Sequence, residues 1–291
     1  MAFSVGVGLT NECNLRCPHC YRPDAVTNRL TVQDIERVCE SIPVKSMNFG
    51  VGENGLHPDY HAILDYLSRR DIVTSVTSNG LSTEVLTDAE LRRFRSIEFS
   101  LDFPTEREHD GFRGQGNWHT VMHALERCAD LRVPVTVTSV MMRHNYDKLS
   151  ALARVAASFG ANLRVNVYQP SKTDMFSVSY EQFWRGFTEL LESTRLVATT
   201  EPVLAGVPVT VTSVMMRLNY DKLPALARVA AAFGANLRVN VYQPSKTNTF
   251  SVSYEQFWQG FTQLLESTRL VATTEPVLAA VLGLENFAGP G

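Results

Sequence analysis

The chain has no long hydrophobic run, because none of its 291 residues lies in a segment apolar enough to span a bilayer. Its first residues lack the basic start and apolar core of a secretory signal. A formal net charge of -3 provides no general attraction to nucleic acids or anionic membranes. Five cysteines, three of them clustered, do not resemble a disulfide framework and favour a reducing compartment. We therefore expect a cytoplasmic protein with no nucleic-acid or membrane partner.

Three cysteines lie within eight residues: Cys13, Cys17 and Cys20. They follow residues 3–9, which alternate small and apolar side chains and predict a strand that ends in a loop. Thiolates are the usual protein ligands of iron-sulfur clusters, and three from one loop would leave one iron of a 4Fe-4S cluster without a protein ligand. A structural zinc site is the alternative, although it normally takes four ligands, often in two separated pairs.

Strand-like and helix-like segments alternate through the first 170 residues. Strands are expected at 3–9, 45–51, 72–77, 96–101, 133–141 and 163–168, and helices at 32–42, 60–69, 88–94, 117–131 and 146–159. A charged, glycine-bearing loop is expected between residues 101 and 117. Such alternation implies parallel strands joined by right-handed crossovers. We predict an α/β fold in which six strands form a partial TIM-like barrel.

The sequence then repeats itself. Residues 133–205 and 207–279 differ at only seven of 73 aligned positions. The differences are His144/Leu218, Ser150/Pro224, Ser158/Ala232, Asp174/Asn248, Met175/Thr249, Arg185/Gln259 and Glu189/Gln263. Two copies are fewer than a stacked repeat array normally needs. We therefore expect a barrel domain at 1–205, a duplicate of the 132–206 strand-helix-strand-helix unit at 206–280, and a tail at 281–291.

The duplication leaves several arrangements open. The extra strand pair could extend the sheet toward closure, or one copy could take barrel positions five and six while the other packs outside or swaps with a second chain. We expect the first copy to complete the barrel, because it directly follows the fourth strand and needs the least rearrangement of the chain.

A glycine-rich turn follows the second predicted strand and contains Val51, Gly52, Glu53 and Asn54. Glycine lets a backbone approach a ligand closely, and a carboxylate can accept hydrogen bonds from an ammonium group. Further polar candidates follow the later strands, where barrels place their active sites. These are Ser78, Asn79, Ser100, Asp102, Arg143 and Tyr168, with His109 and Arg113 in the charged loop as side chains that could face a substrate. Ordinary turn capping is the alternative for Ser, Asn and Asp, and a solvated loop for the charged residues.

The C-x3-C-x2-C loop, with His19 before its last cysteine and Tyr21 after it, resembles the signature of the radical SAM superfamily. By this resemblance the three cysteines hold a 4Fe-4S cluster. Gly52 and Glu53 correspond to a Gly-Gly-Glu-Pro motif that binds the amino group of S-adenosylmethionine, although here Val51 replaces a glycine and Asn54 the proline. The polar strand ends resemble the remainder of the cofactor pocket. Arg143 and Tyr168 have duplicates, Arg217 and Tyr242, so either copy could complete the cofactor pocket.

The resemblance implies an enzyme that cleaves S-adenosylmethionine reductively and uses the 5'-deoxyadenosyl radical to abstract hydrogen from a peptide or small molecule. It also implies an electron donor such as flavodoxin or ferredoxin. Residues 50–59 resemble members with SPASM-type auxiliary clusters, but no cysteine follows Cys128, so we expect no auxiliary cluster in this chain. Two alternatives stay open: an iron-sulfur binding or electron-transfer protein, and a catalytically inactive duplicated or truncated paralogue. No general acid or base is assigned.

Overall fold

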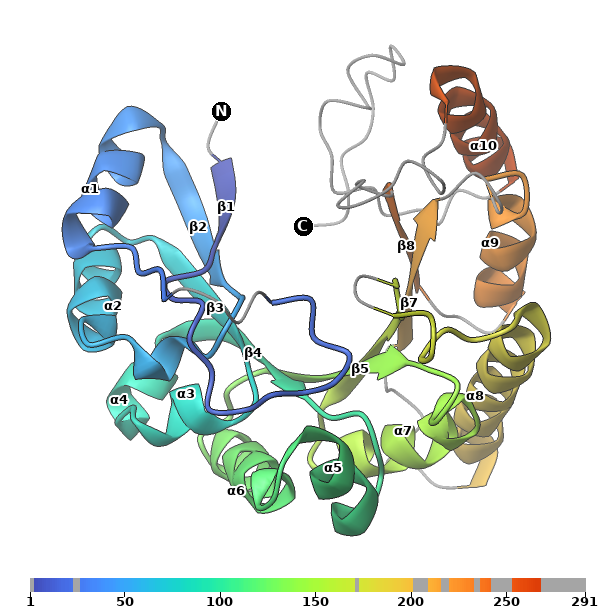
Figure 1. Cartoon of the computed structure of the whole chain (residues 1–291), viewed down its shortest axis with the longest axis horizontal. Helices are drawn as coiled ribbons and strands as arrows, with labels where there is room; N and C mark the ends of the chain where they lie inside the picture. The colour runs from blue at the N-terminus through green and yellow to red at the C-terminus, as the bar shows by residue number, and fades with distance from the viewer. Residues whose placement is uncertain are drawn as a thin grey trace.

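The computed structural model describes residues 3–22, 27–170, 173–200, 209–215, 220–232, 236–241 and 253–267. In this part of the chain, eight strands form one parallel sheet in chain order. They are β1 (Phe3–Val7), β2 (Val44–Phe49), β3 (Val73–Ser78), β4 (Phe94–Ser100), β5 (Val135–Met141), β6 (Asn162–Val167), β7 (Val209–Met215) and β8 (Asn236–Val241). Figure 1 shows the sheet as an open arc with the helices on its outer side. The predicted six-stranded α/β half-barrel is confirmed.

The helices follow the strands as the alternating pattern requires. They are α1 (Val32–Ser41), α2 (Tyr60–Arg69), α3 (Leu81–Glu84), α4 (Asp88–Leu91), α5 (Glu106–Arg113), α6 (Asn117–Asp130), α7 (Leu149–Ser158), α8 (Tyr180–Thr200), α9 (Leu223–Ala232) and α10 (Tyr254–Ser267), with short 3-10 turns η1 (Asn54–Leu56) and η2 (Tyr146–Lys148). At the start of α1, Thr31 and Asp34 form a reciprocal capping box. No helix in the described ranges is long and apolar enough to cross a membrane.

Helix α5 replaces the loop that the sequence analysis predicts, so that prediction is wrong. Thr105 stands at the N-cap position, Glu106 and Glu108 lie in the first turn, and Arg113 lies in the last turn. This order of charges suits the helix dipole. Gly114 then ends the helix with a φ of 147°, a conformation that glycine adopts readily. The charged segment is therefore a helix that runs back over the end of β4.

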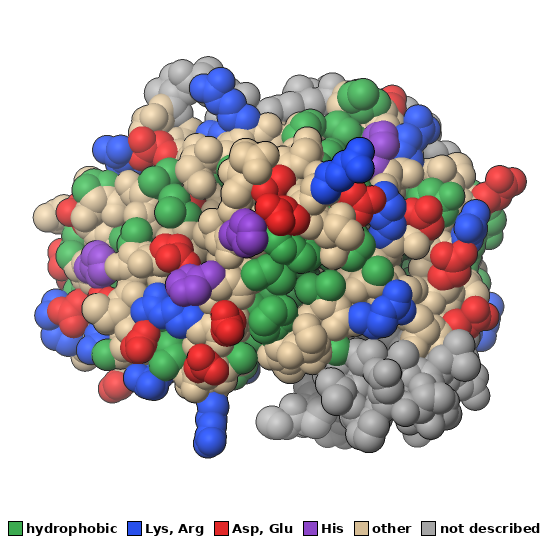
Figure 2. Space-filling model, turned by 90° about the horizontal axis from the view of Figure 1, so that it is seen from below, with side chains coloured by type: hydrophobic (Ala, Val, Ile, Leu, Met, Phe, Trp, Pro, Cys, Tyr) green, Lys and Arg blue, Asp and Glu red, His purple; other side chains and the backbone are tan. Residues whose placement is uncertain are grey.

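The core lies between the sheet and its outer helices. Its fully buried side chains include Met47, Phe49, Ile97, Phe99 and Val137 on strands, and Ile63, Leu67, Val121, Leu125 and Leu152 on helices. Burying one such side chain contributes about 1.5–3 kcal/mol, so the contact between the helices and the sheet is a major source of stability. The outer face seen in Figure 2 mixes acidic and basic side chains, in keeping with the small net charge.

The second copy continues the sheet beyond the first. Strand β7 pairs with β6, and the β7–β8 register repeats the β5–β6 register, with Thr210 opposite Asn236 as Thr136 is opposite Asn162. The first copy therefore supplies strands five and six, as expected. Arg217, Tyr242 and the tail at 281–291 lie outside the described residues.

Candidate functional site

The cysteine loop begins where β1 ends and returns to α1. Its base is closed by backbone hydrogen bonds from Leu30 N to Leu9 O, at 2.9 Å, and from Asn11 N to Asn28 O, at 3.2 Å. In Figure 1 this loop lies on the inner side of the arc. Parallel strands present their carboxyl ends on one edge of the sheet, so the loop is placed beside the turns that follow β2, β3 and β4.

The three cysteines of this loop are half-buried thiols that influence one another electrostatically. A backbone hydrogen bond of 3.0 Å from Cys20 N to Cys17 O forms the turn between two of them. Burial raises the pKa of Cys17 to about 11, against the opposing charge of Arg113. A thiol in this environment needs a compensating positive charge to become a thiolate, and a metal centre supplies one.

This donor set fits an iron-sulfur cluster. Within the described ranges, no three His, Cys, Asp or Glu side chains form a group that could hold a single metal ion. A 4Fe-4S cluster binds each cysteine through a different iron, so its ligands need not converge on one point. Three partly buried thiols in one loop match that requirement, and Cys13, Cys17 and Cys20 are the residues that would hold the group.

Glu53 lies at the carboxyl end of β2, and its carboxylate is enclosed by the turn after β3. It accepts hydrogen bonds from Ser78 Oγ at 2.5 Å, Asn79 N at 2.8 Å, Ser82 N at 2.7 Å and the Ser82 hydroxyl. Only 1% of Glu53 is exposed, and burial raises its pKa although these bonds oppose the shift. The carboxylate therefore joins the two turns, and its predicted contact with the ammonium group of the cofactor stays a prediction.

The backbone at Gly52 is the part of this motif that approaches the cysteine loop. Its φ is +63°, and a Cβ added there would overlap the carbonyl oxygens of Thr10 and Glu12. Val51 also has a positive φ, of 62°, which costs a non-glycine residue roughly 1–2 kcal/mol. Both residues of this turn thus have a left-handed backbone, although one of them is a valine.

Asn79 connects the end of β3 to the cysteine loop. Its side-chain amide donates to Asn14 Oδ1 at 2.8 Å and contacts Cys13 Sγ at 3.6 Å. Its backbone carbonyl accepts from Asn117 Nδ2 at 2.8 Å. Of the polar residues predicted at strand ends, Asn79 contacts a candidate cluster cysteine directly. Ser78 lies behind it, with its hydroxyl engaged by Glu53.

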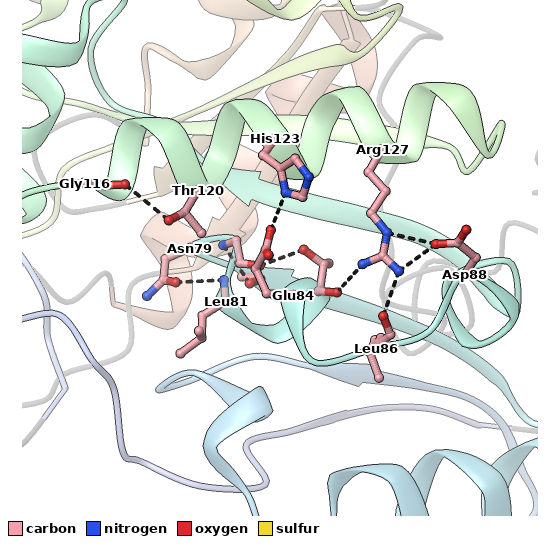
Figure 3. A network of polar contacts seen from close by, with 12 residues as sticks. Asn79, Leu81, Glu84, Leu86, Asp88, Gly116, Thr120, His123 and Arg127 are labelled. Atoms are coloured by element: carbon pink, nitrogen blue, oxygen red, sulfur yellow. Dashed lines mark hydrogen bonds and ion pairs between the residues drawn. The ribbon is translucent and has the colours of Figure 1, made fainter.

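The turn that carries Asn79 is held in place from its outer side by α6. Figure 3 shows Arg127 reaching Leu86 and Asp88, and His123 paired with Glu84, at 2.7 Å. Arg127 Nη1 also donates to Thr83 O at 2.9 Å. These bonds attach the α3–α4 segment to α6. They leave the turn little freedom to move away from the cysteine loop.

Asp102 is completely buried at the end of β4 and is already paired. Its carboxylate accepts from Arg113 Nε at 2.7 Å and from Val140 N at 2.8 Å, and His19 Nε2 lies 3.6 Å away. Burial raises the pKa of Asp102, but the charges of Arg113 and His19 outweigh it and hold the pKa below its ordinary value. The structure thus places Asp102 in an ion pair within the protein, and its predicted contact with the cofactor stays a prediction.

The other predicted residues are dispersed. Ser100 is half-buried and has no side-chain hydrogen bond within the described part of the chain, Arg143 is exposed, and Tyr168 is buried with its hydroxyl on Thr173 O at 3.0 Å. His109 is fully buried, with its Nε2 2.9 Å from Asn117 Oδ1. Arg143 and Tyr168 therefore do not join the group formed around the cysteine loop.

Two residues important to this geometry escaped the sequence analysis. Ser82 lies in the first turn of α3, directly after the Ser78-Asn79-Gly80 turn. Serine is common at the start of a helix, and this is the signal that could have identified it. Asn117 bonds both His109 and Asn79 from the start of α6. Nothing local predicts this role, because both partners come from other elements.

The chain was compared with known proteins. The family described as "Radical SAM superfamily" matches residues 7–156, which is more than half of the chain. Mycofactocin maturase MftC of Mycobacterium ulcerans is 31% identical over 176 residues, which cover 56% of this chain and 46% of the maturase. A probable GTP 3',8-cyclase of Pyrococcus abyssi is 27% identical over 55% of this chain and 54% of its own length. The chain thus spans about half the length of these relatives.

Solved structures share the fold. Streptococcus suis SuiB, solved with its precursor peptide SuiA, superposes with a TM-score of 0.63 at 16% identity, covering 78% of this chain and 52% of SuiB. SuiB has also been solved with S-adenosylmethionine. The segment that matches the family, residues 7–156, contains all three clustered cysteines, Glu53, Asn79 and Asp102. The chain therefore belongs to the radical SAM superfamily, whose members use a 4Fe-4S cluster and S-adenosylmethionine.

Proposed function

We propose that this chain is a radical SAM enzyme that binds a 4Fe-4S cluster through Cys13, Cys17 and Cys20. The observation that supports this best is the packing of the cysteine loop onto the turns after β2, β3 and β4. When bound, the cluster and S-adenosylmethionine supply a 5'-deoxyadenosyl radical that abstracts a hydrogen atom from the substrate. The protein's own residues position the cofactors and limit the access of water.

The residues of the site have distinct roles in this proposal. The Gly52 backbone presents its polar groups next to the loop, and the half-buried Ser100 hydroxyl is free within the described residues to bind S-adenosylmethionine. Glu53 and Ser78 hold the turn that positions Asn79. Asn79 orients the Cys13 side of the loop.

We propose a peptide as the substrate class, with a small metabolite as the alternative. The maturase and SuiB, which was solved with a precursor peptide, support the first, and the probable GTP cyclase supports the second. Reduction of the cluster would need an electron donor such as flavodoxin or ferredoxin. The open arc of the sheet leaves one side of the half-barrel uncovered by strands in the described residues, which suits a large substrate.

The test is to reconstitute the cluster without oxygen, add S-adenosylmethionine and dithionite, and measure 5'-deoxyadenosine by mass spectrometry. We expect product from the parent chain and from Cys39→Ala, which removes a half-buried cysteine outside the loop. Cys17→Ala should abolish it. A fully loaded cluster without product would instead support an electron-transfer protein, and failure to load iron would support an inactive paralogue.

We also propose that residues 1–205 form the catalytic half-barrel and that residues 206–280 are an appended duplicate. Deletion of residues 206–279 tests this division. The shortened chain should fold, as measured by circular dichroism, and should load as much iron as the parent. Loss of iron binding in a folded deletion variant would show that the duplicate contributes to the site.

A further inference from the structure

The end of α5 contacts the cysteine loop through three consecutive residues. Phe112 stacks on His19 with ring centroids 5.1 Å apart, and the Arg113 carbonyl oxygen lies 3.9 Å from Cys17 Sγ. A Cβ added to Gly114 would lie 2.9 Å from Leu15 Cδ2. The contacts at residues 15, 17 and 19 show that this side of the loop rests on α5, as the Cys13 side rests on Asn79.

Arg113 brings a charge into this contact. Its side chain is 9% exposed and pairs with the completely buried Asp102 through Nε and Oδ2 at 2.7 Å. The Asp102 oxygen that binds the guanidinium lies 3.6 Å from His19 Nε2 in the cysteine loop. His19 stands between Cys17 and Cys20 in the sequence. The charged pair therefore lies against the segment that carries two candidate cluster ligands.

Stability alone does not account for this pair. The cost of removing two charges from water largely offsets their attraction, so apolar residues of similar size are often as stabilising. Helix α5 already has apolar contacts to the loop through Phe112 and Gly114. The charges that this pair brings to the cysteine loop are what apolar residues could not reproduce.

We propose that the buried Asp102–Arg113 pair holds the Cys17 side of the loop and sets the reduction potential of the cluster, with Arg113 as a positioning residue whose charge Asp102 moderates. This inference rests on the proposed function, because it requires a loaded cluster. Reduction adds a negative charge to the cluster. A nearby buried cation stabilises the reduced state and raises the potential, whereas a buried carboxylate lowers it.

The two members of the pair should consequently have opposite effects. Asp102→Asn leaves the guanidinium without its counter-charge, so the midpoint potential should shift to a more positive value. Arg113→Gln leaves the carboxylate alone, so the potential should shift to a more negative value and iron loading should fall. The double variant D102N/R113Q removes both charges with little change of shape. Its midpoint potential should be more negative than that of Asp102→Asn.

The experiment is an anaerobic redox titration of each reconstituted variant, followed by visible absorbance and electron paramagnetic resonance. Arg69→Gln, which removes an exposed arginine paired with Asp65 on α2, is the control and should keep the parent potential. Should Arg113→Gln fail to load, the comparison of Asp102→Asn with the double variant measures the same arginine effect.

The proposal would be supported if the midpoint potentials of the two single variants shift in opposite directions. It would also be supported if the double variant has a more negative potential than Asp102→Asn. Shifts of the same sign, or a double variant at the potential of Asp102→Asn, would overturn it and leave the proposed function intact. A parent chain that loads no cluster would overturn the proposed function and this inference with it.

Discussion

The two copies of the duplicated unit have nearly the same sequence and the same strand pairing but different neighbours. Ser100 of β4 pairs with Thr138 in the first copy, and Asn166 of β6 pairs with Thr212, the same position of the second. Tyr168 therefore follows β6 at the place where Asp102 follows β4. A site that depends on Asp102 can form beside the first copy, whereas the second copy borders an aromatic side chain.

The first copy is bonded directly to the candidate site. Val140 N donates to the Asp102 carboxylate, and Asn145 Nδ2 donates to the Asp102 carbonyl at 2.8 Å. Asn145 also caps the end of β5 through Met142 N at 2.7 Å. Nearly identical local sequence thus produces the same elements twice, but the strand that precedes each copy determines which copy supports the site.

The largest expected effect concerns two glycines at the same position of the two copies. A Cβ at Gly186 in α8 would overlap the Tyr146 carbonyl, and one at Gly260 in α10 would overlap the Tyr220 carbonyl. Gly186→Ala should lower the free energy of unfolding by about 3 kcal/mol and also reduce iron loading, because η2 directly follows Asn145. Gly260→Ala should lower stability without changing iron loading. Urea unfolding and iron analysis measure both, and a larger loss of iron in Gly260→Ala would contradict the comparison.

Acid should lower the stability of the folded chain through His109, which contacts Asp102 next to the first copy. Its Nδ1 accepts the Asp102 N–H at 3.4 Å and its Nε2 faces Asn117 Oδ1 at 2.9 Å, so the folded chain holds the neutral ring. Burial, together with the charge of Arg113, lowers its pKa to about 4. Unfolded histidine binds a proton near pH 6.5, so stability should fall as the pH drops from about 6.5 to about 4.

The variant to compare with the parent chain is His109→Gln, whose side chain can still bond to Asn117 but does not titrate. The parent should lose about 2 kcal/mol more than this variant over that pH range. Unfolding curves at several pH values measure the difference. Parallel pH profiles for the two proteins would show that His109 is not held neutral.

A smaller effect is expected where the copies begin. Arg132, just before the first copy, has a φ of 57°, and the residue at the same place before the second copy is Gly206. Arg132→Gly should raise the free energy of unfolding by about 0.5–1 kcal/mol, because glycine adopts the left-handed region without steric cost. Arg132→Ala is the control and should give no gain. Thermal unfolding compares them, and an equal gain in both would exclude the backbone explanation.

The smallest effect concerns two of the seven differences. Arg185 and Glu189 form an exposed ion pair at 2.8 Å on α8, and the second copy has Gln259 and Gln263 in their places. The double variant R185Q/E189Q should change stability by less than about 0.5 kcal/mol, because exposed pairs gain little against solvent and side-chain entropy. A double-mutant cycle in urea measures the coupling, and a value above about 1 kcal/mol would show that the pair stabilises α8 appreciably.

Much of the fold could be predicted, because strands and helices follow local periodicity. The six strands of the half-barrel were predicted near their observed positions. Helix α5 was missed because its charged sequence contains few apolar residues to show a helical period. The candidate site was predicted in part: Asn79 contacts the cysteine loop, whereas the enclosure of Glu53 depends on Ser82 in another element.

The sequence by itself determined the cysteine spacing, the alternation of strands and helices, and the duplication, since these are properties of neighbouring residues along the chain. Only the tertiary structure decided that Asp102 pairs with Arg113, that α5 supports the cysteine loop, and that the first copy borders the site. The physical reason is that a buried carboxylate or guanidinium must find a partner in space. Which partner it finds depends on strand order and register, which no local pattern of residues contains.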